Sequence, residues 1–112
     1  MQRIVFPDAP GWVQSVKLDG KTYKLRARWN VSANTWSLDV LTRGERLLVA
    51  GLRLVRGQAL LRQFQNLELP PGDLFVYDTG ARGDEYTDFT EGRAVLAYIT
   101  ADEVADLSGA DA

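Results

Sequence analysis

An Asp-Gly pair at residues 19 and 20 separates two stretches in which apolar and polar residues alternate. Alternation with a period of two is typical of strands that bury one face. The Asp-Gly pair favours a two-residue hairpin turn, because both of its positions take positive φ. Pairing outward from the turn places Val16 opposite Tyr23, Gln14 opposite Leu25 and Trp12 opposite Ala27. The apolar side chains of both strands then share one face, which predicts a hairpin over residues 12–29.

Four further stretches predict short strands. Residues 35–41 alternate again, and residues 47–55 are almost continuously apolar with an interruption at Gly51. The second pattern favours a buried strand with a bulge at the glycine. Residues 74–77 and 93–100 are apolar enough for two more strands.

Three segments have other patterns. The apolar residues of 58–64 have the spacing of one face of a short helix, which we favour over the alternative of a strand. Residues 79–92 are rich in Gly, Asp, Glu and Thr, and predict an exposed acidic loop. Thr100 followed by Glu103 predicts a capping box that starts a short helix. For residues 108–112 we expect a frayed end.

Together these elements predict a mainly β chain, a small antiparallel β-sandwich or barrel with at most one or two short helices. The chain has 112 residues, of which 46% are hydrophobic and 25% charged, and this composition is typical of a globular protein. We expect one β domain over residues 1–100 and an acidic C-terminal extension over residues 101–112.

The composition excludes several kinds of chemistry. The chain has no Cys and no His, so it lacks disulfides, thiolates and the commonest general base. No stretch fits a phosphate-binding glycine loop, and we expect no cofactor. No apolar run approaches the ~20 residues of a membrane span, and the first residues do not resemble a signal peptide. A net charge of −2 gives no overall basic footprint, so we expect no nucleic acid partner. We also expect no membrane partner, and synthesis in a reducing cytoplasm.

One tripeptide suggests an enzyme. Asp78-Thr79-Gly80 follows an apolar strand and resembles the signature of retroviral-type aspartic proteases, which are dimers in which two such aspartates share one proton. That chemistry also needs a flap and a bracing strand after the motif, and only 34 residues follow Asp78. A strand that ends in an Asx-type turn explains the motif better, and a dimeric protease that uses Asp78 is kept as an alternative.

The same region is acidic. Its carboxylates are Asp78, Asp84, Glu85, Asp88 and Glu91. Carboxylate oxygens are ligands for Ca²⁺, but this spacing does not follow the EF-hand loop. Arg82 and Arg93 also dilute the charge. We therefore expect a solvated loop and no metal.

A basic strip lies on the predicted hairpin. It is formed by Lys17, Lys24, Arg26 and Arg28. Sheets that bind nucleic acid place aromatic side chains on the same exposed face, so that bases can stack on them. Tyr23 and Trp29 lie on the opposite face here. The strip therefore predicts a solvated face or a contact with an acidic protein partner.

The chain has three tryptophans. We expect Trp29 and Trp36 in the core, because they fall on the apolar face of their strands. Trp12 follows Pro10-Gly11 near the start of a strand, and we expect it at an edge, where it could anchor a partner. A free-standing β module that binds protein or carbohydrate is therefore a second alternative.

The order of segments along the chain supplies a further clue. The segments are IVFP at 4–7, VKLDGKTYKLRARWN at 16–30, WSLDV at 36–40, LRLVRG at 52–57, LLRQF at 60–64, YTDF at 86–89 and a closing strand with Tyr98. This series resembles the small baseplate plug proteins of contractile-tailed phages, including cyanophages with simple baseplates. The resemblance covers residues 3–100.

The resemblance implies a structural virion protein of the tail baseplate, made in the bacterial host cytoplasm, and no enzyme. Several copies would close or brace the baseplate near the tail axis and contact hub, spike, tube or wedge components. The loop over 79–92 and the two termini would then be contact arms that order on assembly. The candidate contact residues are Trp12, Lys24, Arg26, Arg28, Arg82, Asp84, Glu85, Tyr86, Asp88 and Phe89.

Overall fold

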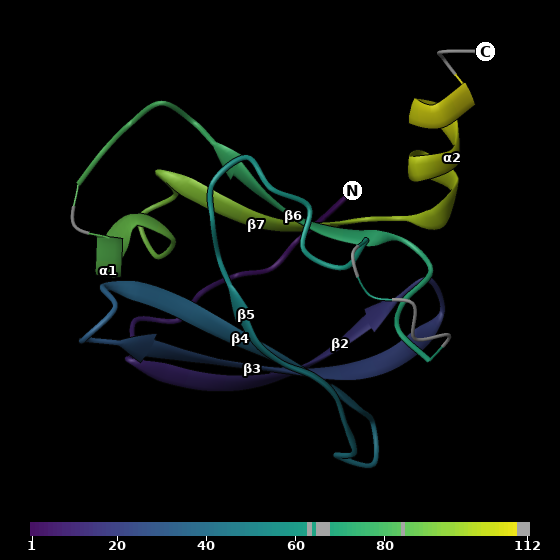
Figure 1. Cartoon of the computed structure of the whole chain (residues 1–112), viewed down its shortest axis with the longest axis horizontal. Helices are drawn as coiled ribbons and strands as arrows, with labels where there is room; N and C mark the ends of the chain where they lie inside the picture. Colours follow the sequence, from purple (N-terminus) through teal and green to yellow (C-terminus); the bar gives the residue numbers. More distant parts are fainter. Residues whose placement is uncertain (63, 65–67, 84, 110–112) are drawn as a thin grey trace.

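A computed structural model describes residues 1–62, 64, 68–83 and 85–109 of the chain. Its strands form two antiparallel sheets that lie one above the other (Figure 1). The four-stranded sheet has the order β2-β3-β4-β5, with β2 at Gly11–Leu18, β3 at Lys21–Asn30, β4 at Thr35–Thr42 and β5 at Leu47–Arg53. The three-stranded sheet has the order β1-β7-β6, with β1 at Gln2–Arg3, β7 at Ala94–Ile99 and β6 at Asp73–Asp78.

Two short helices complete the described part of the chain. Helix α1 spans Glu85–Asp88 and lies at one end of the sheets, and helix α2 spans Ala101–Gly109 and leaves the opposite end (Figure 1). The prediction of a mainly β fold with one or two short helices is confirmed. Neither sheet closes into a barrel over the described residues, and the two layers are compatible with a small sandwich. Within those same ranges, no helix is long and apolar enough to cross a membrane.

The predicted hairpin is present in the predicted register. Val16 pairs with Tyr23, Gln14 with Leu25 and Trp12 with Ala27. Asp19 and Gly20 both have positive φ, 51° and 83°, as the tight turn requires.

Strand β5 confirms the bulge but not the burial. The register of β4 and β5 shifts between Leu38 and Val40, and Gly51 has a φ of 70°. Leu47 is nevertheless 48% exposed, and Ala50 is exposed. The expectation of a buried strand is wrong here because β5 is the edge strand of its sheet, so that part of its apolar surface faces solvent.

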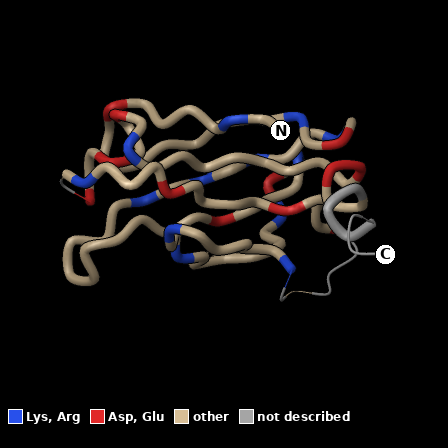
Figure 2. The backbone as a smooth tube through the Cα atoms, turned by 90° about the horizontal axis from the view of Figure 1, so that it is seen from above, with Lys and Arg blue, Asp and Glu red and all other residues tan. Residues whose placement is uncertain are grey.

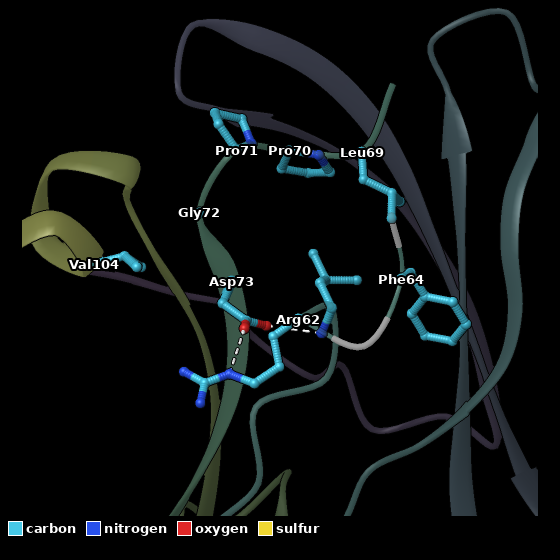
Figure 3. A pocket seen from close by; sticks show the side chains of 9 residues that line it. Arg62, Phe64, Leu69, Pro70, Pro71, Gly72, Asp73 and Val104 are labelled. Carbon is cyan, nitrogen blue, oxygen red and sulfur yellow. Dashed lines mark hydrogen bonds and ion pairs between the residues drawn. The ribbon is translucent and has the colours of Figure 1, made fainter. Parts of the chain in front are cut away.

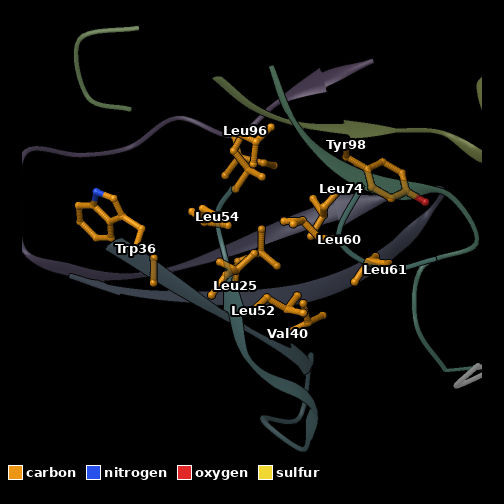
Figure 4. Packing of buried hydrophobic residues seen from close by; sticks show 14 of the residues in the cluster. Leu25, Trp36, Val40, Leu52, Leu54, Leu60, Leu61, Leu74, Leu96 and Tyr98 are labelled. Atoms are coloured by element: carbon orange, nitrogen blue, oxygen red, sulfur yellow. The ribbon is translucent and has the colours of Figure 1, made fainter. Parts of the chain in front are cut away.

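The core lies between the two sheets. Figure 4 shows Leu25 and Val40 of the lower sheet facing Leu74, Leu96 and Tyr98 of the upper one. All five are at most 1% exposed. Complete burial of a leucine side chain contributes about 2 kcal/mol, so this interface between the sheets is the main source of stability.

The three tryptophans differ from expectation in part. Trp36 is buried, as predicted, and Trp29 is only partly buried, packed against the core. Trp12 lies near the start of the edge strand β2, as expected, but it is only 8% exposed and belongs to the core. Phe6, from the connection between β1 and β2, covers Trp12 edge-on, with 4.9 Å between the ring centroids.

Residues 58–64 form no helix over their described positions; residue 63 lies outside them. The segment instead runs beside β6, with Ala59 bridged to Phe75 and Leu60 N donating to Leu74 O at 2.8 Å. The helix prediction is therefore wrong, and the strand alternative is closer. The spacing of the apolar residues is compatible with both a helix and a strand. The backbone hydrogen bonds to β6 favour the extended conformation.

The C-terminal helix begins as predicted. Glu103 N donates to Thr100 Oγ1 at 3.2 Å, and Thr100 N donates to Glu103 Oε1 at 3.0 Å. This is the reciprocal pair of a capping box. The expected fraying is wrong for residues 108 and 109, because α2 continues to Gly109. The rest of that prediction, 110–112, lies outside the described residues.

Candidate partner-contact site

The segment predicted as an exposed acidic loop is held in place by a buried carboxylate. Asp88, the last residue of α1, is 1% exposed. Its Oδ2 lies 2.5 Å from Arg56 Nη2, and its Oδ1 lies 2.6 Å from Arg93 Nε. Burial opposes the charge on Asp88, but the hydrogen bonds from Arg93 and Arg56 outweigh it and lower the pKa of this carboxyl. Asp88 is therefore an internal anion that fixes α1 to the body.

Asp78 belongs to the same network. Its Oδ1 accepts hydrogen bonds from Gly80 N at 2.9 Å, from Arg82 Nη1 at 2.8 Å and from Arg56 Nη1 at 3.1 Å. The first of these bonds is the expected Asx-type turn, and Gly80 has a φ of 86°. The Arg82 guanidinium and the Gly80 amide hold the pKa of Asp78 well below its usual range. In this copy the carboxylate of Asp78 is engaged by its own turn and by Arg82 and Arg56.

The acidic residues do not gather into an ion site. Asp78, Asp88 and Glu91 each pair with an arginine. Within 1–62, 64, 68–83 and 85–109, no group of three or more acidic side chains is placed to hold a metal ion. Asp84 lies outside the described residues.

An aromatic cluster fastens α1 from the inside. Phe89 stacks on Phe6 with 4.8 Å between the ring centroids, and Tyr86 stacks on Trp36 at 5.7 Å. Trp36 Nε1 also donates to Tyr86 O at 3.2 Å. The expectation of an exposed arm is therefore wrong from Tyr86 to Phe89. These aromatic side chains anchor the segment to the core instead of reaching outward.

The basic strip lies on the outer face of the four-stranded sheet and is partly neutralised there. Arg26 Nη2 is 2.7 Å from Asp39 Oδ2, and Lys24 Nζ is 3.2 Å from Glu45 Oε1. Asp39 is buried, and its Oδ1 also accepts from Gly51 N at 2.8 Å. Burial opposes this charge, but the bonds from Gly51 and Arg26 lower the pKa of Asp39. Arg28 is exposed and has no ion pair in the part of the chain that the structure describes.

A hollow of about 240 Å³ with both polar and apolar lining lies between α2 and the connection that precedes β6. Figure 3 shows Val104 on one wall, and Leu69 and Phe64 on the other side. Asp73 is its main polar group, and it accepts from Leu61 N at 2.8 Å and pairs with Arg62 at 3.7 Å. None of the nine candidate contact residues that the structure describes lines this hollow.

The candidate residues thus fall into separate places. Arg82, Glu85, Tyr86, Asp88 and Phe89 lie at the α1 end, while Lys24, Arg26 and Arg28 lie on the outer face of the other sheet. A contact role stays a prediction for all of them. Trp12, Asp88 and Phe89 are buried and offer little surface to a partner.

Two arginines of this region were missed by the sequence analysis. Arg56 joins Asp78 to Asp88, and Arg53 lies exposed at the end of β5. Both lie in a stretch whose pattern is dominated by apolar residues. The pairing of Asp39 with Arg26 can be predicted from the sequence, because a third strand that follows the hairpin as a meander places Asp39 directly opposite Arg26.

These observations define a small two-sheet β protein whose carboxylates serve mainly internal ion pairs. The chain matches the family described as cyanophage baseplate Pam3 plug gp18 over residues 1–102, and it belongs to this family. No curated protein matches the chain. The family places the chain in a phage tail baseplate, as a plug component that associates with other baseplate proteins.

Proposed function

We propose that this chain is a non-catalytic plug, present in several copies, that closes or braces the hub and spike region of the baseplate near the tail axis. Its neighbours would be hub, spike, tube or wedge proteins. It would be made in the bacterial host cytoplasm and incorporated into the virion. Residues 1–100 would act as one β domain, with residues 101–112 as an extension.

The match to the plug family over residues 1–102 carries this proposal. The ion pairs add support, because Asp78 and Asp88 are both committed to arginines. A protease that uses Asp78 has less support, because that carboxyl already pairs with Arg82 and Arg56. A binding module built on Trp12 has less support, because that ring is inside the core.

The test uses the phage that encodes the chain. A stop codon early in its gene should give particles whose baseplates lack density near the tail axis by cryo-electron microscopy, with loss of infectivity. Fully infectious particles with unchanged baseplates would contradict the proposal.

An Asp78→Asn variant separates the plug from the protease. Asparagine can keep the Asx-type turn, so a plug should assemble and infect as before. A protease would lose its activity, and phage carrying this variant would then behave like the stop-codon phage. Asp8→Asn is the control, because Asp8 is exposed and forms no ion pair among the described residues.

A further inference from the structure

We propose that the acidic C-terminal segment of one copy, residues 101–112, binds the outer face of the four-stranded sheet of a second copy, around Arg28 and Arg53. This inference rests on the proposed function for its several copies, and it gives those copies a specific contact.

Arg28, Ser37 and Arg53 form one row across three strands. Arg28 pairs with Ser37 in the β3–β4 ladder, and Ser37 pairs with Arg53 in the β4–β5 ladder. Their side chains point away from the core, because the neighbouring Ala27, Trp36 and Leu52 point into it. Adjacent strands are about 4.8 Å apart, so the two arginines are about 10 Å apart along the sheet.

This row carries positive charge that the molecule does not balance. Both arginines are exposed, and neither has an ion pair within the described ranges. Asp39 on the same face attracts Arg28 electrostatically, but it is buried and is already hydrogen-bonded to Arg26 and Gly51. A row with two free guanidinium groups is therefore suited to a carboxylate-bearing partner.

The surface beside the row is hollowed and partly apolar. One hollow of about 330 Å³ is lined by Arg28, Ser37 and Val31 among others, and Val31 is 79% exposed. A second of about 410 Å³ is lined by Arg53 and Val55. Glu85 also lines the second hollow, so carboxylates should approach on the Arg28 side. A partner segment with both acidic and apolar residues fits this surface.

The C-terminal segment has that composition. It contains Asp102, Asp106 and Asp111, with Val104 and Leu107, and no Lys or Arg. A fourth acidic residue, Glu103, already pairs within its own copy. Its first turn is fixed, because Ala101 N donates to Asp19 Oδ2 at 2.9 Å and the N-terminal amine pairs with Glu103. Acidic positions (red) mark the end of the molecule where α2 begins (Figure 2).

Within one copy α2 lies away from the basic row. Figure 1 shows α2 standing beyond the three-stranded sheet. The strand pairing and the burial of the neighbouring residues place the side chains of the row on the outer face of the four-stranded sheet. The contact must therefore form between copies. It joins two different surfaces, and such head-to-tail contacts generate rings when the rotation closes. Exposed ion pairs are individually weak, so the contact would be salt-sensitive and would gain strength at the high local concentration of a particle.

Cross-linking tests the contact directly, because the chain has no cysteine of its own. Isotope-labelled S37C protein is mixed with A105C protein at low salt and treated with a short bis-maleimide. Ser37 lies between the two arginines, and Ala105 is exposed on α2. The mixed dimer should form several-fold faster than with S15C, the matched control, an exposed serine on the outer face of β2. Rates are normalised to labelling by a monofunctional maleimide.

Two further measurements test the role of charge. Adding R28E/R53E to the S37C protein should lower its rate of cross-linking to A105C protein to the rate of the S15C control. Adding R3E/R43E, which makes the same charge change elsewhere, should leave that rate unchanged. Raising the salt to about 1 M, where the Debye length is about 3 Å, should have the effect of R28E/R53E. Equal rates for S37C and S15C, no effect of R28E/R53E, or only S37C–S37C dimers would overturn the inference. If R28E/R53E protein fails to cross-link but still enters baseplates, the contact is not needed for the proposed function, which stands.

Discussion

The hydroxyl of Tyr98 donates a hydrogen bond to Asp19 Oδ2 at 2.5 Å, and so ties β7 of one sheet to the hairpin turn of the other. The same carboxylate oxygen accepts from Ala101 N, at the start of α2. The Tyr98 oxygen in turn accepts from Gly72 N at 2.7 Å. Burial and the bond to Asp19 raise the pKa of Tyr98, so the phenol remains a donor. One turn residue thereby joins both sheets and the C-terminal helix.

This relationship predicts different effects for two substitutions of Asp19. Asp19→Asn should be mild, because asparagine tolerates the φ of 51° and keeps an accepting oxygen. Asp19→Ala leaves the buried Tyr98 hydroxyl without its acceptor and places a strained residue at positive φ. We expect a loss of about 2 kcal/mol in the free energy of unfolding. Urea denaturation measures both variants, and equal losses would contradict the role of the hydrogen bond.

Gly72 predicts a steric effect at the same junction. A Cβ at this position would lie 1.9 Å from Ile99 O and 2.7 Å from the Tyr98 hydroxyl. The first of these atoms is backbone in β7 and cannot move without disturbing the sheet. Gly72→Ala should therefore cost about 2–3 kcal/mol, as overpacked sites do.

Gly44→Ala is the matched control for this substitution. The nearest atom to its Cβ would be Thr42 Oγ1 at 3.9 Å, so we expect a change within about 0.5 kcal/mol. Thermal unfolding followed by circular dichroism compares the two variants. A Gly72→Ala protein as stable as Gly44→Ala would show that this junction is loosely packed.

The sequence predicted the features that depend on neighbours along the chain. The Asp19-Gly20 turn fixed the register of β2 and β3, since a two-residue turn leaves one way to align the apolar faces. The bulge at Gly51 and the capping box between Thr100 and Glu103 are similarly local. Their signals lie within a few residues of the structure that they specify.

The features that sequence reasoning missed depend on distant partners. The residues around Asp88 have the composition of a solvated loop. Arg56, 32 residues earlier in the chain, nevertheless forms a hydrogen-bonded ion pair with Asp88 and makes it an internal anion. Trp12 is buried because Phe6 covers it, and alternation within a strand does not reveal what lies over that strand. Local patterns therefore select some candidate contact residues that are buried inside the protein.

The ion pairs of Asp88 predict a large loss of stability on neutralisation. Asp88→Asn keeps the shape of the side chain but removes the buried carboxylate that pairs with both Arg56 and Arg93, which are 14% and 22% exposed. The two guanidinium groups keep only the more exposed Asp78 and Glu91 as partners. We expect a loss of about 3 kcal/mol. Asp78→Asn is the control, because Asp78 is more exposed, and it should have a much smaller effect. Urea midpoints for the two variants give the comparison, and a smaller loss for Asp88→Asn than for Asp78→Asn would contradict it.

The lowered pKa of Asp88 also predicts how stability depends on pH. In the unfolded chain this carboxyl titrates near its ordinary value of about 3.9, and in the folded protein it titrates lower. The unfolded state therefore binds the proton more readily, so this stabilisation is present above about pH 4 and is lost as the pH falls through the folded pKa. The titration of Asp88 should therefore have little effect on the urea midpoint between about pH 7 and 5, and should lower the midpoint below about pH 4.

The Asp88→Asn variant tests this assignment. It should show a shallower fall of the urea midpoint in acid, and the fall that remains is due to Asp39 and Asp78, whose pKa values are also lowered. An acid limb as steep in the variant as in the original chain would show that Asp88 is not ionised in the folded protein.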